Sequence, residues 1–312
     1  MPTDPHRSVF ALAAEPGRTS PRGRSGKKTI RRRRRARSLV ALALSVAVVG
    51  GGVSAAYNYL EDEQTLVRER CTAVVGPDEH ELAPDQAGNA ALIAAVSVRR
   101  GMPARAATIG IATAVQESKL RNIDYGDTAG PDSRGLFQQR PSQGWGTQAQ
   151  VLDPLYAANR FYEELDTFDY VTMPITEAAQ KVQRSAYPEA YADHEPEGRA
   201  YASALTGNSP AALNCVLRKA TAAGNPQTVA DSAEAAFGDL GATVEGRNVI
   251  LDADGKRGWA VAQWAVANAA AHQSTSVGHA GLVWNRAEDG WVPASTTEGR
   301  VVISLAGEPG EG

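Results

Sequence analysis

The feature that most constrains this chain is an apolar stretch over residues 39–56 that contains no charged side chain. A helix needs roughly 20 apolar residues to cross a bilayer, so a transmembrane helix is predicted over residues 38–57. Basic residues crowd its N-terminal side, including Lys27, Lys28 and residues 31–35. That asymmetry places the N-terminus in the cytoplasm and the C-terminal bulk outside the cell membrane. A single-pass membrane protein in contact with lipid is therefore expected.

Two alternatives remain for this N-terminal region. The apolar stretch could belong to a cleaved signal peptide, with residues 53–55 as the cleavage site. A retained anchor is favoured because the apolar stretch exceeds a usual signal core and the basic region is long. The arginine run could instead contact nucleic acid. It has no interleaved aromatics and adjoins the predicted span, so anionic lipid headgroups are the expected partner and nucleic acid is not.

The charge is divided between the two sides of the predicted span. Residues 1–37 hold 12 of the 32 Lys and Arg but only two of the 35 Asp and Glu. This basic segment lacks apolar periodicity and is predicted to be disordered. The remainder carries 20 basic and 33 acidic residues, and such a split is typical of a chain that crosses a compartment boundary.

The chain has two cysteines, Cys71 and Cys215, at the two ends of a helix-rich segment. Outside the cytoplasm an even number of cysteines favours a disulfide, which is expected between them. Two cysteines without a histidine at ligand spacing cannot form a metal cluster, so no metal and no cofactor are predicted.

Apolar periodicity predicts helices over residues 89–100, 103–120 and 175–186, and one that opens at Pro154 with Asp153 as N-cap. After Cys215 the pattern changes to helices over 229–240 and 258–272 and strands over 248–252, 276–285 and 300–305. The predicted fold is mainly α, with a small α+β domain at the C-terminus. The expected segments are a tail (1–37), a transmembrane helix (38–57), a stalk (58–70), a helical domain (71–215), a linker (216–226) and an accessory domain (227–312).

Glu117 stands out within the predicted helix over 103–120. It follows the apolar residues Ile111, Ala114 and Val115 and lies near a helix C-terminus. Burial and the helix dipole both disfavour its negative charge, so both raise the pKa of the carboxyl. A carboxyl that keeps its proton near neutral pH can act as a general acid on a glycosidic oxygen.

A run of glycine, glutamine and aromatic residues follows Glu117. It includes Gly135-Leu136-Phe137-Gln138, Gln139 and Trp145. Amides hydrogen-bond sugar hydroxyl and acetamido groups, rings stack on pyranose faces, and glycines allow close backbone approach. The run is therefore consistent with a sugar-binding cleft.

Glu117-Ser118 followed by Gly135-Leu136-Phe137-Gln138 resembles the lysozyme-like superfamily, especially soluble lytic transglycosylases and goose-type lysozymes. The resemblance covers roughly residues 86–205 and implies a lysozyme-like helical domain. It implies that Glu117 is the catalytic acid/base that cleaves N-acetylmuramic acid–N-acetylglucosamine bonds in peptidoglycan glycan strands. The family's Ala-Tyr-Asn-Ala-Gly run is replaced here by residues 178–188. The expected substrate-binding residues are Ser118, Tyr125, Gln138, Gln139, Trp145, Gln183 and Tyr187.

The mechanism is left open between two reactions. A hydrolase commonly uses a second carboxylate, for which Asp124, Asp127 and Asp132 are candidates. A lytic transglycosylase needs none, because the substrate closes a ring on itself. Since no loop aspartate has a distinguishing context, the transglycosylase is favoured. The departure at residues 178–188 leaves a further alternative, a catalytically inactive module that binds glycan or scaffolds the cell envelope.

Overall fold

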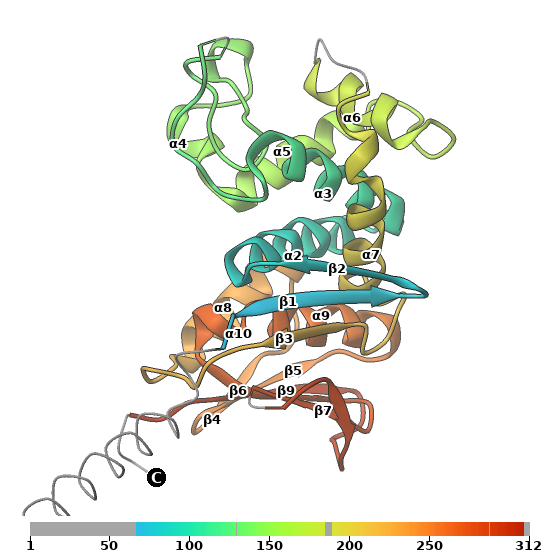
Figure 1. Cartoon of the computed structure of the whole chain (residues 1–312). Coiled ribbons are helices and arrows are strands. Elements are labelled where there is room, and N and C mark those ends of the chain that lie inside the picture. The colour runs from blue at the N-terminus through green and yellow to red at the C-terminus, as the bar shows by residue number, and fades with distance from the viewer. Residues whose placement is uncertain (1–66, 129, 185–188, 287, 309–312) are drawn as a thin grey trace, which may run out of the picture. The chain divides into compact units, whose positions relative to one another are not determined.

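A computed structural model of the chain describes residues 67–308, except 129, 185–188 and 287 (Figure 1). All of these residues belong to one compact unit, Gln64–Gly312. The predicted tail, the transmembrane helix and the stalk up to residue 66 lie outside the described residues. Within the described part of the chain, no helix is both long and apolar enough to cross a membrane.

The helical elements gather mainly between the two cysteines. They are α2 (Pro84–Arg99), α3 (Ala104–Ser118), η2 (Pro141–Gln143), α4 (Gln148–Val151), α5 (Pro154–Leu165), α6 (Ile175–Gln183), η3 (Ala192–His194), α7 (Glu195–Leu205), α8 (Pro226–Phe237), α9 (Gly255–Ala267) and α10 (Ala269–His272). The strands are β1 (Arg70–Val75), β2 (Asp78–Leu82), β3 (Leu213–Val216), β4 (Thr243–Glu245), β5 (Asn248–Asp252), β6 (Ser274–His279), β7 (Leu282–Asn285), β8 (Trp291–Pro293) and β9 (Arg300–Leu305).

The prediction of a mainly α fold is wrong, because the described residues contain two antiparallel sheets. One has the strand order β2-β1-β3, and the other has six strands in the order β4-β5-β9-β6-β7-β8. The three-stranded sheet lies inside the segment expected to be helical. Its strand β2 has the sequence DEHEL, which lacks the β-branched residues typical of strands. Pairing with β1, rather than local preference, makes this segment a strand.

Several local predictions are confirmed. Asp153 caps α5, since its carboxylate accepts hydrogen bonds from the amides of Leu155 and Tyr156. The strands β5 and β9 have the predicted ends. The strand predicted over 276–285 is instead a hairpin, in which the left-handed residues Ala280 and Gly281 separate β6 from β7.

Helix α3 is the central helix of the helical part. Every residue from 106 to 114 is buried, which is the pattern of a helix covered on all sides. A Cβ at Gly110 would lie 2.8 Å from the Tyr162 hydroxyl oxygen and 2.9 Å from the Ile93 Cγ2, so only glycine permits this packing. The close packing fixes the direction of α3 and therefore the position of its C-terminal residues.

The C-terminal sheet joins the helical part through α9 and the short sheet, as Figure 1 shows. The Gln263 side chain on α9 accepts from the amides of Ala212 and Leu213 and donates to the Ala204 carbonyl. The boundary predicted at residues 216–226 stays a prediction, and both of its sides lie in the same compact unit. The Cys71–Cys215 disulfide is confirmed, and it links neighbouring strands of the short sheet.

Candidate functional site

A groove of about 560 Å³ lies at the C-terminal end of α3, and we call it the Glu117 groove. Its lining residues are Gln116, Glu117, Ile123, Tyr125, Gly126, Asp127, Gly130, Ser133, Gln138, Gln139, Arg140, Gln143, Trp145, Gln183 and Arg184. Six predicted site residues meet here: Glu117, Tyr125, Gln138, Gln139, Trp145 and Gln183. Ser118 does not line the groove, and Tyr187 lies outside the described residues.

Glu117 occupies a largely enclosed position in this groove. The Tyr191 hydroxyl donates a hydrogen bond of 2.7 Å to its Oε1, and the Gln183 amide also hydrogen-bonds the carboxylate. Burial raises the pKa of Glu117, and the nearby negative charge of Asp127 raises it further. The two hydrogen bonds act in the opposite direction because they stabilise the charged form. The result is a carboxyl that holds its proton more tightly than an exposed glutamate.

Ser118 is buried behind Glu117. Its hydroxyl donates a hydrogen bond of 2.7 Å to the Leu136 carbonyl. This bond ties the Gly-Leu-Phe-Gln run to the end of α3. Ser118 therefore holds a wall of the groove in place.

Gly135 makes the same run possible. Its φ is +78°, and a Cβ there would lie 2.1 Å from the Val151 carbonyl oxygen. Only glycine meets both requirements, so the loop passes directly against the end of α4. This contact fixes where Gln138 and Gln139 enter the groove.

Two glutamine carbonyl oxygens in the groove have no hydrogen-bond donor among the described residues. The Gln139 Nε2 donates to the Ala157 carbonyl, and the Gln183 Nε2 donates to the Phe137 carbonyl at 2.7 Å. In each case the Oε1 is buried and unpartnered in the part of the chain that the structure describes. A buried acceptor without a donor costs free energy, so neither oxygen is stabilised by the described residues alone.

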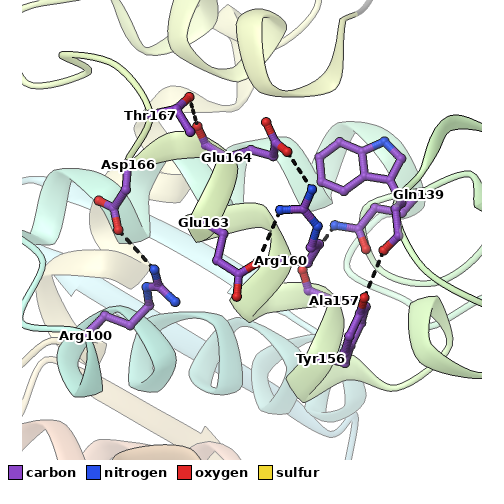
Figure 2. A network of polar contacts seen from close by, with 10 residues as sticks. Arg100, Gln139, Tyr156, Ala157, Arg160, Glu163, Glu164, Asp166 and Thr167 are labelled. Carbon is purple, nitrogen blue, oxygen red and sulfur yellow. Dashed lines mark hydrogen bonds and ion pairs between the residues drawn. The ribbon is translucent and has the colours of Figure 1, made fainter.

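Residues of helix α5 contact two residues that line the groove, Gln139 and Trp145. Figure 2 shows the polar contacts around α5. Besides the bond from Gln139 to Ala157, the Tyr156 hydroxyl donates to the Trp145 carbonyl at 3.3 Å. The Arg160 guanidinium lies 5.6 Å from the centre of the Trp145 ring. Ion pairs with Glu163 and Glu164 hold Arg160 in turn, so Trp145 is braced from the helix side.

The three candidate aspartates occupy different environments. Asp132 is 2.9 Å from the Arg140 Nε and also accepts from the Ser142 amide. Hydrogen bonds from Ser142 and the charge of Arg140 hold the pKa of Asp132 well below its usual range, which indicates a structural role. Asp124 does not line the groove. Asp127 does, and it is close enough to act on the charge of Glu117.

Some residues of the groove were missed from the sequence. The Tyr191 hydroxyl hydrogen-bonds Glu117, although Tyr191 was not among the expected site residues. Tyr187 belongs to residues 178–188, the segment that replaces the family's third motif, and Tyr191 follows that segment. A second tyrosine four residues after Tyr187 was the only available signal. Arg140 and Arg184 also line the groove. Arg140 lies in a loop that no periodicity predicts, and Arg184 is the C-cap of α6, within the helix predicted over 175–186.

Strained backbone is concentrated in this region. Seven described non-glycine residues have positive φ, and four of them, Lys119, Leu120, Gln138 and Arg184, follow α3 or α6 or lie in the loop of the groove. Such conformations cost of order 1–3 kcal/mol each and tend to cluster at functional sites. The described residues include no group of three or more His, Cys, Asp or Glu that could hold a metal ion.

Neither models of known protein families nor curated protein sequences give a match to this chain.

Proposed function

We propose that this chain is a peptidoglycan-cleaving glycosidase, with Glu117 as its catalytic acid/base. The observation that carries the proposal is the Glu117 carboxyl itself, whose pKa is raised by burial and which faces a groove rich in amides. The substrate bond is the link between N-acetylmuramic acid and N-acetylglucosamine. No cofactor takes part in this scheme.

In the favoured reaction the enzyme is a lytic transglycosylase. The protonated Glu117 donates its proton to the glycosidic oxygen as the bond breaks. The resulting carboxylate then removes the proton of the muramic acid 6-hydroxyl, which attacks the anomeric carbon and closes an anhydro ring. Tyr191 and Gln183 stabilise the carboxylate between the two steps because both hydrogen-bond its charged form.

A hydrolase is the second candidate, and Asp127 favours it. Inverting glycosidases place a carboxylate across the groove from the acid, where it activates a water molecule. Asp127 lines the groove together with Glu117, and its Oδ1 accepts from the Gly130 amide at 2.7 Å. Products distinguish the reactions, since a transglycosylase leaves anhydro ends and a hydrolase leaves reducing ends.

We also propose that the protein acts outside the cytoplasm, anchored by residues 38–57. The confirmed disulfide supports an oxidising compartment. Glycan strands of the wall and the lipid bilayer are then its two partners. An anchor would keep the groove close to the membrane.

The test uses full-length protein and purified peptidoglycan. Wild type is expected to release soluble muropeptides, and Glu117→Gln is expected to lose activity by about 10³-fold or more, because the glutamine cannot donate a proton. Glu177→Gln is the control, since Glu177 is an exposed glutamate on α6 that does not line the groove. Absence of products from the wild type would overturn the enzyme proposal and leave a glycan-binding module.

A further inference from the structure

A second groove of about 560 Å³ lies against the same end of α3, and we call it the Glu197 groove. It is lined by Glu81, Leu82, Gln86, Val115, Gln116, Lys119, Leu120, His194 and Glu197. Gln116 lines both grooves. The Gln116 side chain therefore lies between the two grooves.

The partition between the two grooves is built by hydrogen bonds. The His194 Nε2 lies 2.8 Å from the Gln116 Oε1, so the ring donates to the amide oxygen. On the far side, the Gln86 amide donates to the Lys119 carbonyl at 2.8 Å. Lys119 itself has a left-handed backbone, with φ of 54°. The walls of the second groove are therefore held by bonds between separate elements, α2, α3 and η3.

One carboxylate in the second groove is not neutralised by a direct contact. Glu197 on α7 is half-buried, and within the described residues it has no hydrogen bond or ion pair. Burial raises the pKa of Glu197, while the nearby His80 and His194 lower it. Glu81, the other acid, is already paired with Arg70 at 3.0 Å. Glu197 is thus the carboxylate that remains available to a ligand.

A lysine of the same groove, Lys119, also has no oppositely charged partner among the described residues. The Lys119 ammonium makes no ion pair in the part of the chain that the structure describes, although two acids line the same groove. An anion and a cation that share a groove without contacting each other match a ligand that carries both charges. Such a ligand has an amine for Glu197 and a carboxylate for Lys119.

We propose that the Glu197 groove binds a zwitterionic peptide, the peptide stem carried by muramic acid in peptidoglycan. The inference rests on the proposed function and names the second part of its substrate. Stems of peptidoglycan carry a free amine on a diamino acid and a free terminal carboxylate. A stem seated beside Gln116 positions its own sugar in the adjacent Glu117 groove, so the two grooves together select glycan strands that retain their peptides.

Direct binding tests the groove without relying on activity. The probe is a tripeptide of L-alanine, D-isoglutamate and meso-diaminopimelate, added to the full-length protein in a calorimeter. Glu197→Gln is expected to weaken binding about tenfold, because a hydrogen-bonded charge pair is lost. Lys119→Met tests the other pole and is expected to weaken binding to a similar degree. Glu79→Gln, an exposed glutamate on β2 outside both grooves, is the control.

Kinetics then separate this inference from the proposed function. On strands with peptides, Glu197→Gln is expected to raise KM about tenfold with kcat unchanged. On strands stripped of peptides by an amidase, wild type and variant should behave alike. Tripeptide binding without cleavage of either substrate would overturn the glycosidase but not the groove. Cleavage without tripeptide binding, or binding that Glu197→Gln leaves unchanged, would overturn the groove.

Discussion

Glu117 is subject to opposing influences on its pKa. Enclosure and the charge of Asp127 favour the protonated form, whereas Tyr191 and Gln183 favour the carboxylate. A residue that must give a proton and then take one benefits from this balance, because neither state is strongly trapped. Tyr191 is the group through which the balance can be changed with least disturbance.

Tyr191→Phe removes one hydrogen bond to the carboxylate and leaves the ring in place. The pKa of Glu117 is expected to rise, because the bond stabilises only the charged form. In a profile of kcat/KM against pH, the alkaline limb should move to higher pH. Activity at the optimum should fall by about tenfold, since the carboxylate formed during the reaction loses its support. An unmoved alkaline limb would show that Tyr191 has no electrostatic role.

Glu117 also carries a stability cost that depends on pH. A carboxyl whose pKa is raised in the folded state binds its proton more tightly there than in the unfolded chain. Stability is therefore lost as pH rises from the unfolded pKa, about 4.3, through the folded value. Glu117→Gln should unfold at a higher temperature than wild type at pH 7. Below pH 4 the difference should shrink, as thermal melts can show.

The sequence was enough to select Glu117 because two independent effects, position in a helix and apolar neighbours, pointed to the same carboxyl. It could also select Gln138, Gln139, Trp145 and Gln183 by type and by resemblance. It could not select Tyr191, because Tyr191 contacts Glu117 only where the chain at the start of η3 packs against α3. Contacts between segments 74 residues apart leave no local pattern.

At the scale of elements, the groove is a helix end closed by a loop. The loop begins after Ser118, binds α3 through Leu136, and is braced by α5 through Ala157. Its shape depends on a few backbone positions more than on side chains. Gly135 combines a positive φ with a close backbone contact.

Gly135→Ala should be strongly destabilising. The new Cβ would meet the Val151 carbonyl at 2.1 Å, and the left-handed backbone adds further strain. We expect a loss of about 3 kcal/mol or more in the free energy of unfolding. Gly144→Ala is the matched control, since its φ is also positive but nothing lies within 4 Å of the added carbon. It should lose only about 1–2 kcal/mol in the same denaturant titration. Equal losses would refute the close approach of the loop to α4.

Helices were more predictable than strands in this chain. Apolar spacing gave α3 and α5 to within two residues at their starts, because a helix carries its hydrogen bonds within itself. Strand β2 depends on β1, and β1 depends on β3 more than 130 residues later. Strand pairing between residues so far apart in sequence depends on the tertiary structure and not on the local sequence of either strand.

At the scale of the whole molecule, Gln263 joins the helical part to the C-terminal sheet. Its amide is fully buried and bonds backbone groups of α7, of the turn after α7, and of β3. Two tryptophans of the C-terminal sheet reinforce this junction. Trp284 donates to the Asn214 side chain and Trp291 donates to the Leu213 carbonyl, both at 2.9 Å.

Gln263→Leu keeps the volume of the side chain but removes every one of these amide bonds. Several buried backbone groups would lose their partners at once, so we expect a loss of about 4 kcal/mol in unfolding free energy. Gln227→Leu, at an exposed position on α8, should change it by no more than about 0.5 kcal/mol.

Calorimetry of wild type should show one transition for the described unit. Two transitions would show that the predicted domains unfold separately.

The organisation predicted after Cys215 was partly accessible from composition, since β-branched strands and alanine-rich helices alternate there. The way that this region packs against the helical part was not accessible from composition. The contacts are made by a buried glutamine and by two tryptophan N–H groups, and in the sequence these residues look like ordinary core residues. The compact unit over residues 64–312 therefore contains contacts between its helical part and its C-terminal sheet that the predicted domain order did not indicate.

The position of the disulfide has a mechanical consequence. Cys71 and Cys215 lie opposite each other on paired strands, with Cα atoms 4.0 Å apart and a sequence separation of 144. Tension applied between residues 67 and 308 would pass from one strand to the next through this covalent link. The helices that carry the Glu117 groove would bear none of that load. With the bond reduced, the same pull could draw out about 500 Å of extra chain.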